Sequence, residues 1–196
     1  MVTVDGLLLA AGAGRRMGRP KALVVGEDGV GWLPAAVQRL KDGGCRRVSV
    51  VLGASADEAA VLLAEAAVDH TDLHVVVAPD WAEGMGASLR TGLAALDPRA
   101  EAVLLTLVDL PDVTADVVRR VVAAATGPGV LARAAYDGTP GHPVLLGREH
   151  WDGVRATAAG DQGARDYLAT RDVLLVECGD LATGRDVDTP ARTDAG

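Results

Sequence analysis

The order of apolar and amphipathic segments is the feature that most restricts the fold of this sequence. Short apolar runs typical of buried strands cover residues 6–10, 47–52, 73–78 and 102–108. Between and after them, segments with helical periodicity cover residues 31–41, 57–68, 84–96 and 114–125, the last with Thr114 as N-cap. Strands joined through helices pair in parallel with right-handed crossovers. We therefore predict an α/β protein folded as a three-layer sandwich.

The spacing changes after about residue 128. We predict strands at 130–135, 143–146 and 173–177, with a turn at 137–142. Helices are expected at 149–157 and 162–169. The chain has no linker-like segment, and its 196 residues suit one folding unit. We expect residues 1–196 to form a single domain.

The composition restricts what the core contains. Phenylalanine is absent and aromatic residues are only 3% of the chain, although 49% of the residues are hydrophobic. The core must therefore consist of small and branched aliphatic side chains, which suit a parallel sheet under alanine-rich helices.

The net charge of −8 makes nucleic acid an unfavourable partner, because an acidic surface repels phosphate backbones. No uncharged apolar stretch is long enough to span a membrane, and the N-terminus lacks the basic region of a signal peptide. Cys45 and Cys178 are far apart and show no metal-binding spacing. We expect a cytoplasmic protein that binds neither membranes nor nucleic acid.

Residues 9–21 carry the strongest functional signal. They read LAAGAGRRMGRPK, follow the first predicted strand directly, and place four basic residues within seven positions of an acidic chain. Glycines let backbone amides converge on an anion, and arginine and lysine side chains bind phosphate oxygens. The segment fits neither the dinucleotide fingerprint, because Met17 replaces its third glycine, nor the P-loop, because Arg19 and Pro20 follow Gly18. It predicts a different polyphosphate-binding loop.

Carboxylates follow at two places where a metal site is expected. Asp109 comes directly after the strand predicted at 102–108, and ligands of open α/β sheets bind beyond the carboxyl ends of strands. Carboxylate oxygens suit Mg²⁺, which bridges protein and substrate phosphates. Asp186 and Asp188 share one face of an extended segment, so one of them can complete the site. Helix capping is the alternative role. Asp109 would then cap a helix that follows Pro111, and Asp188 would cap a helix that begins at Pro190.

Several segments together resemble one family of enzymes. Residues 9–21 are similar to the glycine-rich signature of the MobA-like nucleotidyltransferases, and within them most similar to the cytidylyltransferases of the molybdenum cofactor. Further matching segments occur in the same order, so the resemblance extends over residues 5–190. They read DWAEGMGASLR (80–90), DLP (109–111), GHPV (141–144), GDQGAR (160–165) and DVDTP (186–190). The resemblance implies a Rossmann-like, mostly parallel sheet with one antiparallel strand.

The resemblance also implies roles for particular residues. Nucleotide binding falls to Leu9, Ala10, Ala11, Gly12, Gly14, Lys21, Gly53, Ser88 and Asp109. Catalysis falls to Arg16, Lys21 and Asp109, with Arg16 and Lys21 neutralising the triphosphate. The metal, Mg²⁺, is expected on Asp109 and Asp188. The acceptor pocket is expected at His142, Asp161 and Arg165.

The reaction implied is transfer of CMP from CTP to the phosphate of molybdopterin, with release of pyrophosphate. Ala11 favours CTP over GTP, because Ala-Ala-Gly at this point of the loop accompanies the cytidylyl enzymes. A molybdoenzyme that receives the cofactor is a further possible partner. Two alternatives stay open: another phosphorylated acceptor, such as a sugar phosphate, isoprenoid precursor or phospholactate, and a nucleotide-binding accessory protein without activity of its own.

Overall fold

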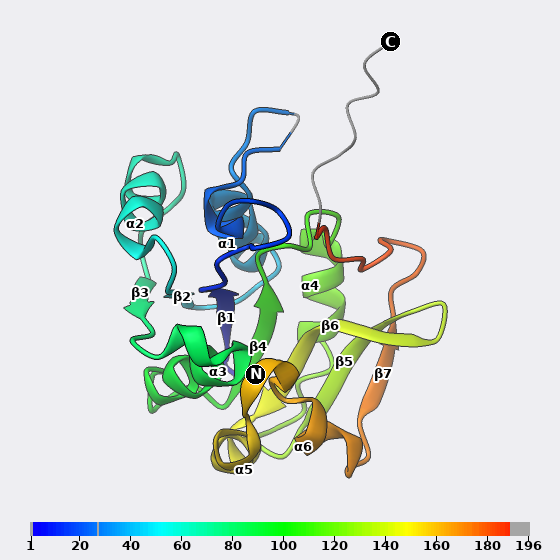
Figure 1. The fold of residues 1–196 in the computed structure, drawn as a ribbon. Helices are drawn as coiled ribbons and strands as arrows, with labels where there is room; N and C mark the ends of the chain where they lie inside the picture. Colours follow the sequence, from blue (N-terminus) through cyan, green and yellow to red (C-terminus); the bar gives the residue numbers. More distant parts are fainter. Residues whose placement is uncertain (1, 27, 189–196) are drawn as a thin grey trace.

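The computed structural model describes residues 2–26 and 28–188, whose strands form one seven-stranded sheet (Figure 1). The strand order is β3-β2-β1-β4-β6-β5-β7. The strands are β1 (Val4–Ala10), β2 (Val48–Leu52), β3 (Leu73–Val77), β4 (Ala102–Leu107), β5 (Leu131–Tyr136), β6 (Thr139–Gly147) and β7 (Leu174–Glu177). Only β6 is antiparallel to its neighbours, β4 and β5. The prediction of a Rossmann-like, mostly parallel sheet with one antiparallel strand is confirmed.

Six α-helices cover the two faces of this sheet in the described part of the chain. They are α1 (Trp32–Asp42), α2 (Ala56–Glu65), α3 (Met85–Ala94), α4 (Ala115–Val122), α5 (Trp151–Thr157) and α6 (Arg165–Ala169). Short 3₁₀ turns precede α1, α3, α5 and α6, at Lys21–Leu23, Trp81–Glu83, Arg148–His150 and Gly160–Gln162. The Thr114 hydroxyl accepts a hydrogen bond from the amide of Val117 at 3.4 Å, so it is the expected N-cap of α4.

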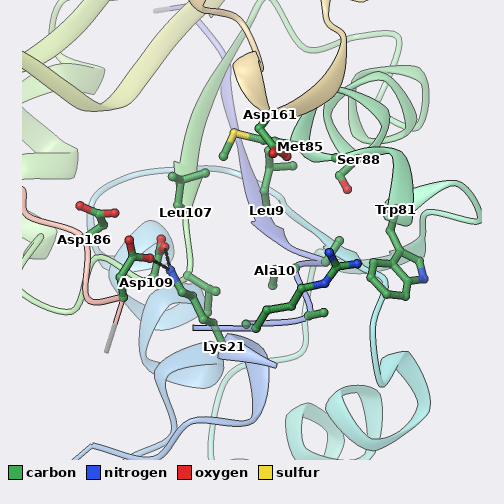
Figure 2. Close-up of a pocket in the computed structure, with 18 of the residues that line it drawn as sticks. Leu9, Ala10, Lys21, Trp81, Met85, Ser88, Leu107, Asp109, Asp161 and Asp186 are labelled. Carbon is green, nitrogen blue, oxygen red and sulfur yellow. Dashed lines mark hydrogen bonds and ion pairs between the residues drawn. The ribbon is translucent and has the colours of Figure 1, made fainter. Parts of the chain in front are cut away.

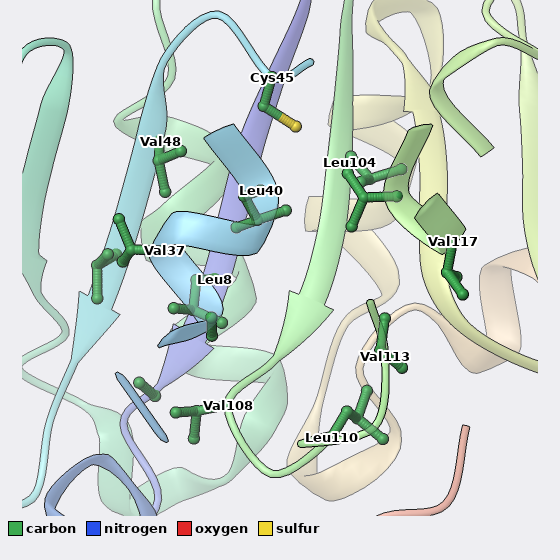
Figure 3. Packing of buried hydrophobic residues seen from close by; sticks show 14 of the residues in the cluster. Leu8, Val37, Leu40, Cys45, Val48, Leu104, Val108, Leu110, Val113 and Val117 are labelled. Atoms are coloured by element: carbon green, nitrogen blue, oxygen red, sulfur yellow. The ribbon is translucent and has the colours of Figure 1, made fainter. Parts of the chain in front are cut away.

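Alternation along β1 divides the core into two layers. Leu8 packs with α1 and α4 on one face, while Leu7 and Leu9 pack with α3 on the other. Figure 3 shows the first of these layers, where Leu40 of α1 lies among Leu8, Val48 and Leu104. Because both faces are covered, the central strands contain aliphatic residues at nearly every position.

Two of the strand predictions were wrong in detail. The strand at 73–78 was expected to be buried, but β3 is an edge strand on which Val75 and Val77 are 39% and 55% exposed. The turn expected at 137–142 is only two residues long, Asp137 and Gly138. Both residues have positive φ, which suits a two-residue hairpin, so β6 already begins at Thr139.

The strand order determines where on the sheet a binding site is expected. Chain connections leave β1 and β4 toward opposite edges of the sheet, β1 toward β2 and β4 toward the β5–β6 hairpin. Ligands of open α/β sheets bind beyond the carboxyl ends of strands at such a point. No helix in the described residues is long and apolar enough to cross a membrane.

Candidate functional site

A cleft of about 640 Å³ lies at the carboxyl ends of β1 and β4 (Figure 2). Its volume is in the range of pockets that bind nucleotide-sized ligands. It is lined by residues 9–16, Lys21, residues 81–85, Ser88, residues 107–109, Asp161, Arg165, Asp186 and Asp188. The glycine-rich loop, the aspartates and the start of α3 therefore meet at one place.

The loop after β1 owes its shape to glycine. Gly14 has a φ of +59°, and a side chain there would begin 1.9 Å from the carbonyl oxygen of Arg19. The chain therefore folds back on itself between Gly14 and Lys21. At Gly12, by contrast, an added Cβ would meet no described atom within 4 Å, so this part of the loop faces open space. An open glycine backbone at the end of a strand suits the close approach of a phosphate.

Lys21 lies at the centre of the charged groups. Its Nζ donates hydrogen bonds to Oδ2 of Asp109 at 2.5 Å and to Oδ1 of Asp188 at 2.6 Å. Burial lowers the pKa of Lys21, but the hydrogen bonds that it donates to the two carboxylates, together with their negative charges, outweigh burial, and the net shift of the pKa is upward. The pKa of Asp188 is lowered, chiefly by its hydrogen bond from Lys21. The lysine is therefore firmly protonated and held away from open solvent.

The carboxylates also fit a divalent metal. Asp109, Asp186 and Asp188 each offer an oxygen, and these atoms lie within 4.8 Å of one another. Oδ1 of Asp109 is buried and accepts no hydrogen bond from the described residues, which leaves one oxygen ligand free. Oxygen-only donors suit Mg²⁺ or Mn²⁺. The structure thus brings both Asp186 and Asp188 to Asp109, whereas the sequence left the choice between them open and only the family resemblance favoured Asp188.

Arg16 approaches the same group from the solvent-exposed side of the loop. Its Nη1 lies 2.7 Å from Oδ2 of Asp188, but its side chain is 76% exposed. An exposed ion pair contributes little to stability. Arg16 can therefore leave Asp188 for a ligand at low cost.

The third side of the cleft is the start of α3. Ser88, which is 4% exposed, lines the cleft together with Trp81 and Met85. Trp81 and Met85 were not expected from the sequence. Trp81 immediately follows Asp80 in one of the segments that resemble the family, but only the tertiary structure places its ring here (Figure 2).

Gly53 does not line the cleft. A Cβ at this position would lie 2.6 Å from Cβ of Trp81 and 2.7 Å from the carbonyl oxygen of Ala11. Gly53 therefore makes room for Trp81 and the loop.

The acceptor residues expected from the sequence are divided between two places. Asp161 and Arg165 line the cleft, whereas His142, on β6, is not among the residues that line it. Its carbonyl oxygen accepts a hydrogen bond from Tyr136 Oη at 2.6 Å. Burial, and then the charge of Arg133, lower the pKa of His142 to about 4, so its imidazole is neutral at pH 7.

A glycine-rich loop, a partly buried lysine and clustered aspartates at the switch point of a Rossmann-like sheet define a nucleotide-binding class of protein. Comparison with protein families gives the same result: the model of the MobA-like NTP transferase domain matches residues 6–174. The chain belongs to this family.

Two curated relatives differ in the activity their names state. Nicotine blue oxidoreductase of Paenarthrobacter nicotinovorans is 37% identical over 95% of this chain and 92% of its own length. Molybdenum cofactor cytidylyltransferase of Escherichia coli K12 is 27% identical over 76% of this chain and 72% of its own. The names of these two relatives therefore do not point to one shared reaction.

Solved structures agree with the fold. Rv0371c of Mycobacterium tuberculosis H37Rv is 28% identical, with a TM-score of 0.77 over 96% of this chain and 94% of that one. The same protein in complex with manganese matches with a TM-score of 0.71 at 27% identity, over 95% and 94% of the two chains.

Proposed function

We propose that this protein is a metal-dependent cytidylyltransferase that transfers CMP from CTP to the phosphate of molybdopterin, and that residues 1–196 act as one domain. The observation that carries the proposal is the meeting of the glycine-rich loop, Lys21 and the three aspartates in one cleft. An accessory protein without catalysis would not need Lys21, Asp109 and Asp188 to be retained together.

The bond changes are simple. An oxygen of the acceptor phosphate forms a bond to the α-phosphorus of CTP, the bond from that phosphorus to the bridging oxygen breaks, and pyrophosphate leaves. A phosphate monoester is already anionic near neutral pH, so the protein needs no strong general base. Catalysis then consists of positioning and charge neutralisation.

The chain's own residues divide these tasks. Backbone amides of residues 9–14 hold the polyphosphate, and Lys21 and Arg16 turn from Asp188 to the leaving pyrophosphate. Ser88 and Trp81 lie where the base would enter. A divalent metal on Asp109, with Asp186 or Asp188, would supply positive charge to the phosphates.

Support for the cytidine base and the pterin acceptor comes from the sequence and the more distant relative. Ala11 is 4% exposed and lines the cleft, and its motif Ala10-Ala11-Gly12 resembles that of the cytidylyl enzymes. The Escherichia coli relative is named for this reaction.

A second candidate, an oxidoreductase acting on nicotine blue, is favoured by one observation: the relative with that name is 37% identical over 95% of this chain. The lining of the cleft argues against this candidate, because it carries the charged groups that we propose bind phosphate. Cys45 and Cys178, the two thiols of the chain, are buried outside the cleft.

The deciding experiment incubates the protein with CTP, Mg²⁺ and molybdopterin and measures pyrophosphate and the cytidylylated pterin. The control replaces CTP by GTP. A parallel reaction follows the absorbance of nicotine blue in the presence of a chemical reductant. Product in the first reaction supports the proposal, whereas turnover in the parallel reaction alone would establish the second candidate.

A further inference from the structure

The segment that carries Asp186 and Asp188 has no regular secondary structure of its own. It covers residues 178–188, and among the described residues no helix or strand follows Glu177 at the end of β7. The path of such a segment depends on the individual contacts that its backbone and side chains make with the rest of the chain. The position of two of the three clustered carboxylates therefore depends on what holds the 178–188 segment in place.

Asp112, in the connection from β4 to α4, provides several of these contacts. Its Oδ2 accepts hydrogen bonds from the amide of Thr183 at 2.7 Å, from the hydroxyl of Thr183 at 2.5 Å and from the amide of Gly184 at 3.2 Å. Its other oxygen, Oδ1, is buried and accepts no hydrogen bond from the described residues. Within the described chain, the carboxylate of Asp112 therefore makes all its hydrogen bonds to the 178–188 segment.

A second contact lies three residues away on both segments. The amide of Val187 donates a hydrogen bond to the carbonyl oxygen of Asp109 at 3.0 Å. Asp112 comes after Asp109 in the chain, whereas its partner Gly184 comes before Val187, so the two segments run antiparallel. Because the neighbours of Val187 on both sides are the clustered aspartates, these two contacts set how far their carboxylates lie from that of Asp109.

Gly184 also fixes the segment against the sheet. Its φ is +63°, and a Cβ at this position would lie 2.0 Å from Cε2 of Tyr136 on β5. Only glycine fits such a close approach with this backbone conformation. The segment therefore passes directly against the ring of Tyr136, and Asp112 holds it at this same point.

The charges of the site explain why the segment needs an anchor outside the cleft. Three carboxylates with oxygens within 4.8 Å of one another repel each other. Lys21 and Arg16 offset this repulsion by binding Asp188. Under the proposed function both turn to the polyphosphate, and the 178–188 segment then loses two ion pairs. Asp112 does not line the cleft, so its hydrogen bonds to the segment can persist when the nucleotide binds.

We propose that Asp112 is a positioning residue for the metal site. By holding Thr183 and Gly184, it keeps the two aspartates of the segment beside Asp109 while the nucleotide binds. The inference rests on the proposed function, because that function requires a divalent metal at these carboxylates. Asp112 follows the Asp-Leu-Pro segment directly and belongs to none of the segments that resemble the family.

The test measures metal affinity rather than turnover. Full-length protein is titrated with Mn²⁺, alone and with a non-hydrolysable CTP analogue, and electron paramagnetic resonance reports the free Mn²⁺. A titration of the analogue without protein gives the Mn²⁺ that it binds by itself. The variants are Asp112→Ala, Thr183→Val and Thr183→Ser. The control is Asp180→Ala, which removes an ion pair with Arg120 near the start of the same segment.

We expect Asp112→Ala to weaken Mn²⁺ binding in the presence of the analogue by about 10–100-fold, the range observed when groups that orient metal ligands are removed. Thr183→Val keeps the backbone donors and should weaken binding by a smaller factor. Thr183→Ser restores the hydroxyl and should bind as the wild type does. Asp180→Ala should stay within about twofold of the wild type, because its contact is independent of that of Asp112.

A purely structural role of Asp112 makes a different prediction. Asp112→Ala would then lower the melting temperature and leave the Mn²⁺ affinity unchanged at a temperature where circular dichroism shows the variant to be folded, which would overturn the inference. An equal loss of affinity in Asp180→Ala would also overturn it, because any loosening of the segment would then have the same effect.

Two further outcomes are distinguishable. If Asp112→Ala does not fold, the comparison of Thr183→Val with Thr183→Ser decides: weaker Mn²⁺ binding in the valine variant supports the inference, and equal binding overturns it. A wild type that binds no Mn²⁺ in the presence of the CTP analogue would count against the proposed function itself.

Discussion

Lys21 takes the place of a bound cation among the aspartates. Its ammonium group satisfies Asp109 and Asp188 at hydrogen-bonding distance, where a divalent ion would need the same oxygens. Metal and lysine therefore compete for these carboxylates, and a polyphosphate that attracts Lys21 would relieve the competition. Nucleotide and metal are then expected to bind with positive cooperativity.

Lys21→Met tests this competition. Without nucleotide, the variant should bind Mn²⁺ more tightly than the wild type, because no ammonium group has to be displaced. With CTP, its affinity should fall by about 10–150-fold, since a charge-assisted contact to phosphate is lost. Calorimetric titration of Mn²⁺ and of CTP measures both, and Lys41→Met, at an ion pair remote from the cleft, is the control. Weaker Mn²⁺ binding in Lys21→Met would contradict the competition.

Asp109→Asn should remove the metal. The change preserves shape but eliminates the charge of the most buried carboxylate of the cluster. Loss of an outer-shell partner already weakens metal sites by about 10–100-fold, so loss of a ligand should reach the upper end of that range. Mn²⁺ titration and the pyrophosphate assay should both report the loss, whereas Asp116→Asn on the surface of α4 should behave as the wild type. Retained turnover would remove Asp109 from the metal site.

Ala11→Gly concerns the choice of base. We expect the wild type to prefer CTP to GTP and the variant to relax that preference, because the smaller residue leaves more room for a purine. One methyl group in a pocket changes discrimination by about 10–200-fold. The measurement is the ratio of kcat/KM for CTP and GTP with one acceptor. A wild type that uses GTP equally well would show that Ala11 does not select the base.

At the scale of elements, the contact between the end of β2 and the turn before α3 shapes one wall of the cleft. Gly53 follows β2 directly, and Trp81 fills the space where a side chain at position 53 would lie. The loop at Ala11 closes the contact from the third side, since the amide of Ala54 donates to its carbonyl oxygen at 3.0 Å.

Gly53→Ala should therefore destabilise the protein by about 1–3 kcal/mol, the usual cost of an extra methyl group in a packed region. Urea denaturation measures the change. Gly127→Ala is the matched control, because an added Cβ there meets no described atom within 4 Å and the backbone has no positive φ. Equal stability of Gly53→Ala and the wild type would mean that Trp81 moves freely, and the wall would not be rigid.

The sequence best predicts the helices and strands that have a clear pattern within their own residues. The strands containing Leu7 and Leu104 are mostly aliphatic, and their order along the chain is enough to place Asp109 near the glycine-rich loop. The start of β6 was missed because Pro140 and Pro143 are typical of turns, whereas here Asp137 and Gly138 alone form the turn.

Other parts of the site depend on tertiary packing and leave no local signal. The position of Trp81 depends on the empty space at Gly53. Likewise, the sequence predicts that Val75 is a core residue. It is exposed because the strand order places β3 at the edge of the sheet.

On the scale of the whole molecule, a second charged group lies at the end of the sheet opposite the cleft. Asp97, whose side chain is 3% exposed, accepts hydrogen bonds from Arg46 and Arg99, and Arg46 also binds Asp5 at the start of β1. The hydrogen bonds from Arg99 are the main cause that lowers the pKa of Asp97 well below its usual range. This network ties the segment after α3 to β1 and to the start of β2.

Asp97→Asn should expose the pH dependence of this network. A carboxyl whose pKa is lowered by folding stabilises the protein above its unfolded pKa of about 3.9, and the stabilisation is lost as the pH falls toward the folded pKa. The difference in melting temperature between wild type and variant should be constant above about pH 5 and shrink below about pH 4. Asp152→Asn, at a 97% exposed side chain, should show no such difference. A difference in melting temperature that stays unchanged down to pH 2 would show that the charge of Asp97 does not cause the stabilisation.

The strand order has an evolutionary consequence. Residues 4–96 contain β1, β2, β3 and α3 and supply the glycine-rich loop, Lys21 and Ser88, whereas the three clustered aspartates and Arg165 of α6 come from later in the chain. Under the proposed assignment, the groups that contact the base and the polyphosphate are encoded in the first half of the gene, and those that hold the metal and the acceptor in the second half. Mutations after residue 100 that spare the three aspartates can then alter the acceptor while recognition of the donor is inherited. A chimera joined in the segment between α3 and β4 should therefore exchange acceptor preference between relatives in a single step.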